Sequence, residues 1–123
     1  GKWRSEFFLV FVKDERGQLE LSVCTPKQRQ VFVKNADLQP GKWVHLAFSW
    51  NTAKGEGVIY INGKPAARTV REDWKEGSYS FKAPWNIQLG RNANEPAGGA
   101  YDNLKIYNRQ LSDAEILADS AEK

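Results

Sequence analysis

The feature that most limits how this chain can fold is an Asn-Gly pair set between two strand-like runs. Asn62 and Gly63 separate residues 58–61 from residues 64–70. Both residues tolerate positive φ, and together they form the preferred centre of the two-residue type I′ turn that joins antiparallel strands. The sequence therefore predicts a β-hairpin over residues 58–70.

Strand-like patterning with a period of two continues along the chain. Residues 7–12 are continuously apolar, as in a strand buried on both faces, and residues 18–23 alternate polar with apolar after a turn at residues 14–17. These two runs are expected to pair as a hairpin. Further strands are expected at residues 30–33, 43–50, 86–89 and 100–107.

The strand expected at residues 43–50 has two largely apolar sides, so we place it centrally in its sheet. Phe48 and Trp50 lie on one side, and Trp43 and His45 on the other. Both Trp side chains are expected in the core, because Trp is usually well buried. His45 is the only His of the chain, and we interpret it as structural.

One helix is expected near the end of the sequence. Ser112 and Glu115 have the spacing of a capping box, and Leu111 and Ile116 that of a hydrophobic staple. The helix should run to about Ser120. The predicted fold class is all-β: an antiparallel two-sheet β-sandwich with one short C-terminal helix, formed by residues 1–123 as a single domain.

Composition excludes several classes of function. The net charge is +3 with both signs interspersed, so the chain carries no block of charge typical of nucleic-acid binding. Cys24 is the only Cys, so neither an intrachain disulfide nor a Cys/His zinc cluster can form. No apolar run approaches the roughly 20 residues that a membrane span needs.

Four stretches, in the right order, resemble the laminin-G-like domains of the concanavalin-A-like lectin and glucanase families. They are GKWVHLAFSWN at 41–51, VIYINGKP at 58–65, IQLG at 87–90 and GAYDNLKIYNRQLSDAEI at 99–116. The resemblance implies a jelly-roll sandwich. That family opens with further strands, which we do not find before Trp3. We therefore expect either an abbreviated version of the domain or a fragment whose missing strands lie in another chain or were removed. Asn103 also stands where the family usually has Glu.

Asp102 is the candidate metal ligand. On the expected last strand it shares a face with Leu104 and Ile106, so its carboxylate should point toward the core. A buried carboxylate needs hydrogen bonds or a cation. The resemblance implies a structural calcium ion near this position, whereas backbone N–H groups are the alternative partners.

An aromatic stretch after the hairpin is the candidate carbohydrate site. Trp74, Tyr79 and Trp85 can stack on the apolar faces of sugars, and Arg91 and Asn92 can hydrogen-bond their hydroxyl groups. The alternatives are that Trp74 covers the hairpin and that Trp85 belongs to the core.

Catalysis on this fold would need paired carboxylates on one strand, and no apolar run carries them. We therefore expect a non-catalytic, lectin-like module that binds a glycan or polysaccharide, located extracellularly, on the cell surface or in the periplasm. The alternative is a protein–protein assembly or adhesion module that uses an open sheet edge or a loop face, with a protein partner or another chain completing the sheet.

Overall fold

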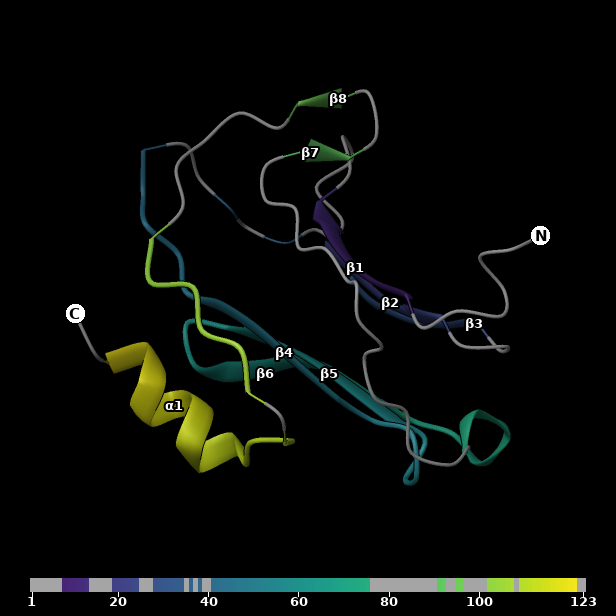
Figure 1. Ribbon diagram of the computed structural model, residues 1–123. Helices are drawn as coiled ribbons and strands as arrows, with labels where there is room; N and C mark the ends of the chain where they lie inside the picture. Colours follow the sequence, from purple (N-terminus) through teal and green to yellow (C-terminus); the bar gives the residue numbers. More distant parts are fainter. Residues whose placement is uncertain are drawn as a thin grey trace.

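The structure is a computed structural model in which most elements are strands and one is a C-terminal helix (Figure 1). It describes residues 8–13, 19–24, 28–34, 36, 38, 41–75, 91–92, 95–96, 102–107 and 109–121. The elements in chain order are β1 (Phe8–Lys13), β2 (Leu19–Cys24), β3 (Gln28–Val33), β4 (Leu46–Asn51), β5 (Glu56–Ile61), β6 (Lys64–Val70), the 3-10 helix η2 (Glu72–Trp74), β7 (Arg91–Asn92), β8 (Glu95–Pro96) and α1 (Asp113–Ala121).

The first six strands form two antiparallel three-stranded sheets in which every strand pairs with its neighbour in the chain. The orders are β1-β2-β3 and β4-β5-β6, and β7 and β8 form a separate two-stranded ladder. The predicted pairing of residues 7–12 with residues 18–23 is confirmed by the β1–β2 ladder. The short β7–β8 pair, at residues 91–92 and 95–96, was not among the predicted strands. The strand expected at 86–89 lies outside the described residues.

The predicted hairpin is confirmed as β5 and β6. Asn62 has φ 51° and Gly63 has φ 81°, as a type I′ turn requires. The turn is also tied to the segment before β4, because the Asn62 backbone N–H donates to the His45 carbonyl at 2.8 Å. The Asn62 Oδ1 accepts in return from the His45 backbone N–H at 3.1 Å. The hairpin is longer than predicted at its open end, since β5 already begins at Glu56.

One face of the second sheet packs on the first sheet. Leu19 and Val31 of the first sheet meet Ile59 of β5 in one buried cluster, which Trp74 of η2 completes. Trp50 packs partly buried against this cluster, with its ring 6.1 Å from that of Phe48. The expectation that Trp50 belongs to the core is therefore confirmed, and the two sheets lie one over the other in Figure 1.

Helix α1 covers the opposite face of the second sheet. Successive residues of a strand point to opposite faces, so Val58 and Tyr60 point away from Ile59 and contact Ile116 of the helix. The expected capping box is present: the Glu115 backbone N–H donates to the Ser112 Oγ at 3.2 Å, and the Ser112 backbone N–H donates to Glu115 Oε1 at 3.0 Å. The described chain thus forms three layers, two sheets and a helix.

Trp43 is not in the core, contrary to the prediction. Its side chain is 72% exposed. The ladder of β4 begins only at Leu46, so Trp43 lies before the strand whose alternation was expected to turn it inward. The sequence pattern located the strand but not its first paired residue.

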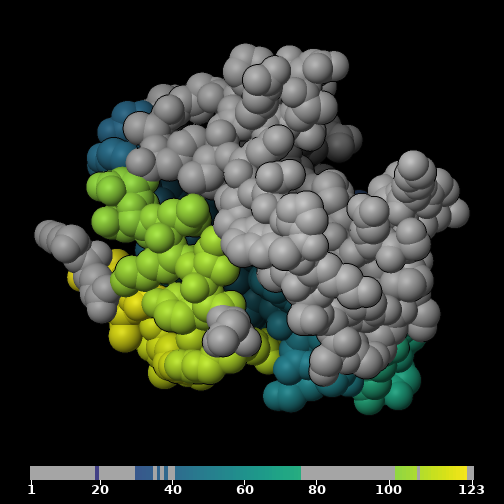
Figure 2. Space-filling view, viewed as in Figure 1, coloured from purple at the N-terminus to yellow at the C-terminus, as the bar shows by residue number. Residues whose placement is uncertain are grey.

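The strand predicted at residues 100–107 is also absent over its described part. Residues 102–107 belong to no strand, and Asn103 has φ 57°, which interrupts an extended backbone. The side chains of Leu104 and Ile106 are each 59% exposed. In the space-filling view the segment is a light-green strip on the surface beside the yellow helix α1 (Figure 2). All six described residues of this segment are exposed, so the predicted alternation of buried and exposed side chains is not found.

Candidate functional site: a polar pocket between the hairpin and the helix

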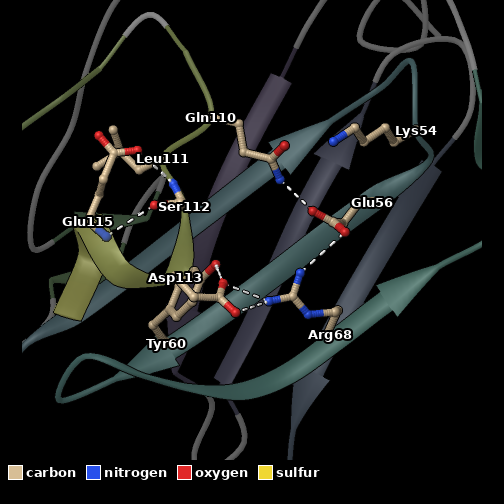
Figure 3. Close-up of a pocket in the computed structure, with 9 residues that line it drawn as sticks. All are labelled: Lys54, Glu56, Tyr60, Arg68, Gln110, Leu111, Ser112, Asp113 and Glu115. Atoms are coloured by element: carbon tan, nitrogen blue, oxygen red, sulfur yellow. Dashed lines mark hydrogen bonds and ion pairs between the residues drawn. The ribbon is translucent and has the colours of Figure 1, made fainter.

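A pocket of about 400 Å³ opens where the β5–β6 hairpin meets the start of α1 (Figure 3). Alternation along β5 and β6 places side chains of both strands on the helix-covered face of the sheet, and the chain entering α1 supplies the other wall. The lining residues are Lys54, Glu56, Tyr60, Arg68, Gln110, Leu111, Ser112, Asp113 and Glu115. Apart from Leu111, all of them carry a hydrogen-bonding side chain.

Arg68 lies at the centre of the pocket's polar network. Its Nη2 donates to both carboxylate oxygens of Asp113, at 2.7 and 2.8 Å, and its Nη1 donates to Glu56 Oε2 at 3.3 Å. The Tyr60 hydroxyl donates to Asp113 Oδ1 at 2.7 Å. One guanidinium group therefore joins a strand carboxylate to a helix carboxylate, as Figure 3 shows.

These contacts shift the pKa values of the network so that Asp113 stays ionised and Tyr60 and Arg68 stay protonated. The hydrogen bond from Tyr60, followed by that from Arg68, lowers the pKa of Asp113 below its ordinary value. Burial, followed by the hydrogen bond to Asp113, raises the pKa of Tyr60. The hydrogen bond to Asp113 raises the pKa of Arg68. At neutral pH Asp113 is therefore an ionised acceptor, and Tyr60 and Arg68 are donors.

Gln110 fixes the position of the chain that enters the helix. Its Nε2 donates to Glu56 Oε1, and its Oε1 accepts from Asn51 Nδ2 at 3.2 Å. Both ends of the amide are thus used within the protein. The connection ties the pocket's outer wall to the turn between β4 and β5.

Glu115 is held ionised at the outer end of the pocket. Arg109 donates to both of its carboxylate oxygens, through Nη1 at 3.0 Å and through Nη2 at 2.5 Å. Together with the Ser112 backbone N–H, this lowers the pKa of Glu115 to about 2. A glycosidase of the two-carboxylate type needs one carboxylic acid with a raised pKa. Glu115 and Asp113 are shifted in the opposite direction.

Of the residues predicted to bind carbohydrate, Trp74 is the one whose side chain is described, and it does not line this pocket. Trp74 is only 9% exposed and belongs to the cluster between the sheets, with the Arg71 guanidinium 5.5 Å from its ring centroid. Its ring is occupied by core packing, so the expectation of an exposed stacking surface is not met at Trp74. Tyr79 and Trp85 lie outside the described residues. Arg91 and Asn92 form β7, whose backbone alone is described.

Asp102 is exposed, and its Oδ1 accepts a hydrogen bond from the Asn103 backbone N–H at 2.9 Å. The expectation that it points into the core is therefore wrong, because the segment forms no strand to orient it, and its partner is a backbone N–H group. Calcium requires six to eight oxygen ligands. In the part of the chain that the structure describes, no three His, Cys, Asp or Glu side chains gather in a group that could hold a metal ion. The described surroundings of Asp102 do not fit calcium.

Sequence reasoning did not find the pocket. Alternation could have placed Glu56 and Tyr60 on one face of β5, but a regular hairpin from the predicted turn would put Arg68 opposite Gly57, on the other face. The register shift between Ile59 and Tyr60 pairs Arg68 with Val58 and so brings it to the face of Tyr60. Alternation could not have shown that Gln110 and Asp113 lie opposite, because that depends on where the helix docks.

Comparison with known proteins agrees with the resemblance. The family model described as the concanavalin A-like lectin/glucanases superfamily, of laminin-G type, matches residues 2–117, so the chain belongs to this family. Serum amyloid P-component of Rattus norvegicus is 28% identical over 105 residues, which are 85% of this chain and 42% of that protein. The chain therefore spans less than half of the length of this relative.

A solved structure with a similar backbone belongs to an S-layer domain-containing protein from Clostridium thermocellum. The TM-score is 0.47 at 16% identity, over 95% of this chain and 58% of that one. Among the described residues, no helix is both long enough and apolar enough to cross a membrane.

Proposed function

We propose that this chain is a non-catalytic carbohydrate-binding module. Membership of a lectin and glucanase superfamily supports the proposal, and the polar pocket carries it. Sugars are recognised by several hydrogen bonds to hydroxyl groups, and such bonds contribute most when the protein groups are already held in place. Arg68 donates to Asp113, and Arg68 and Gln110 both donate to Glu56, before any ligand arrives.

The state of the pocket's acids supports binding rather than hydrolysis. Glu56 and Asp113 both accept from Arg68, so neither carboxylate faces the other across an open site. General-acid catalysis needs a proton on one carboxyl group near neutral pH, and the lowered pKa of Asp113 works against that.

The finer features expected from the resemblance form part of this proposal. A complete jelly roll would include strands beyond the six that pair in the two sheets, and an extracellular, cell-surface or periplasmic location is usual for such modules. Tyr79, Trp85, Arg91 and Asn92 remain the predicted residues for aromatic stacking and hydrogen bonding to sugar. A calcium ion at Asp102 remains an implication of the family alone.

The experiment is a glycan and polysaccharide array, probed with the chain in calcium and then in a chelator. Saturable binding to one class of glycan supports the proposal. Loss of that binding in the chelator would show that the binding needs a metal, and an Asp102→Ala variant, compared in the same two buffers, would test whether Asp102 helps to hold it. Absence of binding to every glycan would turn attention to the second candidate.

The second candidate is an assembly or adhesion module that uses an open edge, and exposed apolar side chains favour it. Trp43, Leu104 and Ile106 are 72%, 59% and 59% exposed. Residues 102–107 lie outside the described ladders, and their exposed Leu104 and Ile106 side chains are of the kind that a protein partner covers. Light scattering across a concentration series tests self-association, and Leu104→Lys together with Ile106→Lys should abolish it.

A further inference from the structure

The Asn62-Gly63 pair that forms the hairpin turn also carries a chemical reactivity. In an Asn-Gly sequence the backbone nitrogen of the Gly can attack the side-chain carbonyl of the Asn, because Gly has no Cβ that would shield this nitrogen. Asn62 is the one Asn of the chain that a Gly follows, and it is exposed. The chain therefore has one position at which spontaneous deamidation is chemically favoured.

The reaction needs water and no other reactant. The Gly63 backbone nitrogen bonds to Asn62 Cγ, the Cγ–Nδ2 bond breaks, and the proton that the nitrogen loses leaves with Nδ2 as ammonia. A five-membered succinimide ring remains. Water then breaks one of the two bonds from the ring nitrogen to a carbonyl carbon. Cleavage at Cγ leaves aspartate at position 62, and cleavage at the main-chain carbonyl carbon leaves isoaspartate, through whose Cβ and Cγ the main chain then runs.

In the folded chain, the backbone conformation of the turn holds the reacting atoms apart. Closing the five-membered ring requires the Gly63 nitrogen and the Asn62 Cβ to lie on the same side of the Asn62 Cα–C bond. Asn62 has φ 51°, in the left-handed region, where ψ is about +30 to +60°. A ψ in this range places the two atoms on nearly opposite sides of that bond. The attack therefore requires Asn62 to leave the left-handed conformation.

Two hydrogen bonds and the packing of α1 oppose such a change. The Asn62 backbone N–H donates to the His45 carbonyl at 2.8 Å, and Asn62 Oδ1 accepts from the His45 backbone N–H at 3.1 Å. Both the main chain and the side chain of Asn62 are thus held. Gly63 is buried beside Ser120 and Leu117 of α1, so the solvent that must remove its proton is kept away. The reaction needs a local opening of the hairpin turn.

We propose that Asn62 is a deamidation site that the folded hairpin protects, and that isoaspartate at this position releases helix α1 from the turn. Isoaspartate adds one carbon atom to the main chain, which a two-residue type I′ turn cannot accommodate. Gly63 lies so close to α1 that an added Cβ would be 2.3 Å from Ser120 Oγ, so a shifted turn displaces the helix. Aspartate keeps the main-chain length and an oxygen that accepts from His45. The inference does not depend on the proposed carbohydrate binding.

The first test compares deamidation in the folded and in the unfolded chain. The chain is incubated in buffer and in urea that unfolds it, at one pH and temperature, and peptide mapping by mass spectrometry follows each Asn. Asn62 should react at least about 10-fold more slowly in the folded chain, the factor that an opening cost of about 1.4 kcal/mol gives. Equal rates in the two states, or no reaction of Asn62 in urea, would overturn the proposal.

Asn103 is the internal control for this test. It is also exposed and left-handed, with φ 57°, but Leu104 follows it and shields the attacking nitrogen. Asn103 should stay intact over the time in which Asn62 reacts in urea. Equal reaction of both residues would show that the Asn-Gly pair is not a special site.

The second test measures what the modification does to the fold. Chain aged in urea is returned to buffer, and its deamidated fraction is separated by its additional negative charge. Peptide mapping gives the share of isoaspartate in this fraction. The isoaspartate form should melt about 5 °C or more below the original chain. Asn62→Asp, which has the same charge and a normal main chain, should melt close to the original, and equal melting of the variant and the isoaspartate form would overturn the predicted release of α1.

The third test uses the reciprocity of coupled sites. If isoaspartate in the turn weakens the docking of α1, then weaker docking of α1 must also loosen the turn. Ile116→Ala shortens the buried side chain that packs α1 on Val58 and Tyr60. It should speed the deamidation of Asn62 in the folded chain by about 5-fold or more.

Val31→Ala is the matched control for Ile116→Ala. It removes buried methyl groups from the cluster between the two sheets, on the opposite side of the second sheet from α1. The folded control should deamidate at the rate of the original chain. An equal increase in both variants would overturn the coupling between turn and helix, because the opening would then be global.

Discussion

The two ends of the β5–β6 hairpin hold the same helix in different ways. At the turn end, Gly63 lies so close to α1 that an added Cβ would be 2.3 Å from Ser120 Oγ and 2.9 Å from Leu117 Cδ1. At the open end, Arg68 holds Asp113 through charged hydrogen bonds, and a pocket remains between strand and helix. At the turn end, close packing leaves no room for a ligand. At the open end, the polar network stabilises the contact between strand and helix and leaves a pocket there.

A glycine is required at each end of the hairpin. The atoms around each glycine decide how much stability a larger residue would cost there. Gly55 at the open end has φ 66°, and an added Cβ would lie 2.2 Å from the Arg71 carbonyl oxygen. That oxygen belongs to the backbone directly after β6, so it cannot move aside unless the end of β6 moves with it. The Ser120 hydroxyl near Gly63 belongs to a side chain that can rotate.

The largest expected effect is therefore that of Gly55→Ala. We expect it to lower the free energy of unfolding by about 3 kcal/mol or more, because left-handed backbone strain adds to a clash with backbone. Urea denaturation followed by tryptophan fluorescence measures it. A loss of less than about 1 kcal/mol would mean that the turn relaxes freely and that the open end is not rigid.

Gly63→Ala should be the next largest, at about 2 kcal/mol, because the clash falls on a side chain that can move. Gly41→Ala is the matched control: Gly41 has φ 79° and nothing lies within 4 Å of an added Cβ. It should cost only about 1 kcal/mol, the strain of the left-handed conformation. Equal losses in the two variants would show that helix contact contributes nothing at the turn end.

At the open end, Tyr60→Phe should lower the stability by about 1 kcal/mol, since it removes the donor to Asp113 and keeps the buried ring. The pKa of Asp113, followed by NMR titration, should rise, because that hydrogen bond is the largest cause of its lowering. Tyr107→Phe is the control, as it removes a hydroxyl that donates to Asp119 at 2.8 Å on the surface. The control should change the stability by less than about 0.5 kcal/mol.

The smallest expected effect is on the stability of the chain at acidic pH. Because the pKa of Glu115 is lowered from 4.5 to about 2 in the folded chain, its ionisation contributes stability above pH 4.5 that is lost as the pH falls toward 2. Glu115→Gln, which keeps a side chain able to close the capping box, should be slightly less stable at neutral pH. Thermal melting from pH 6 to pH 2 should show the two curves converging. Parallel curves would mean that the ion pair between Glu115 and Arg109 contributes no pH-dependent stability.

The sequence predicted those features that local chemistry determines. The positive φ of Asn62 and Gly63, the capping box at Ser112 and the position of Trp50 follow from a few neighbouring residues. Asp102 and Trp43 were misplaced because alternation cannot tell whether a partner strand lies alongside or where a ladder begins. The pocket was missed because its walls come from a hairpin and a helix whose docking depends on the whole fold.

The neighbour-to-neighbour order of the first six strands also bears on how the chain folds. Each pairing closes only a short loop, so its entropic cost is small, and folds built from local pairings form quickly. The strands can therefore pair while the later part of the chain is still leaving the ribosome. Residues 110–115 contact these strands across a much longer separation in sequence, as in the hydrogen bonds from Arg68 to Asp113 and from Gln110 to Glu56. The pocket therefore needs the last part of the described chain as well as the hairpin, and it exists only in a chain in which α1 is docked.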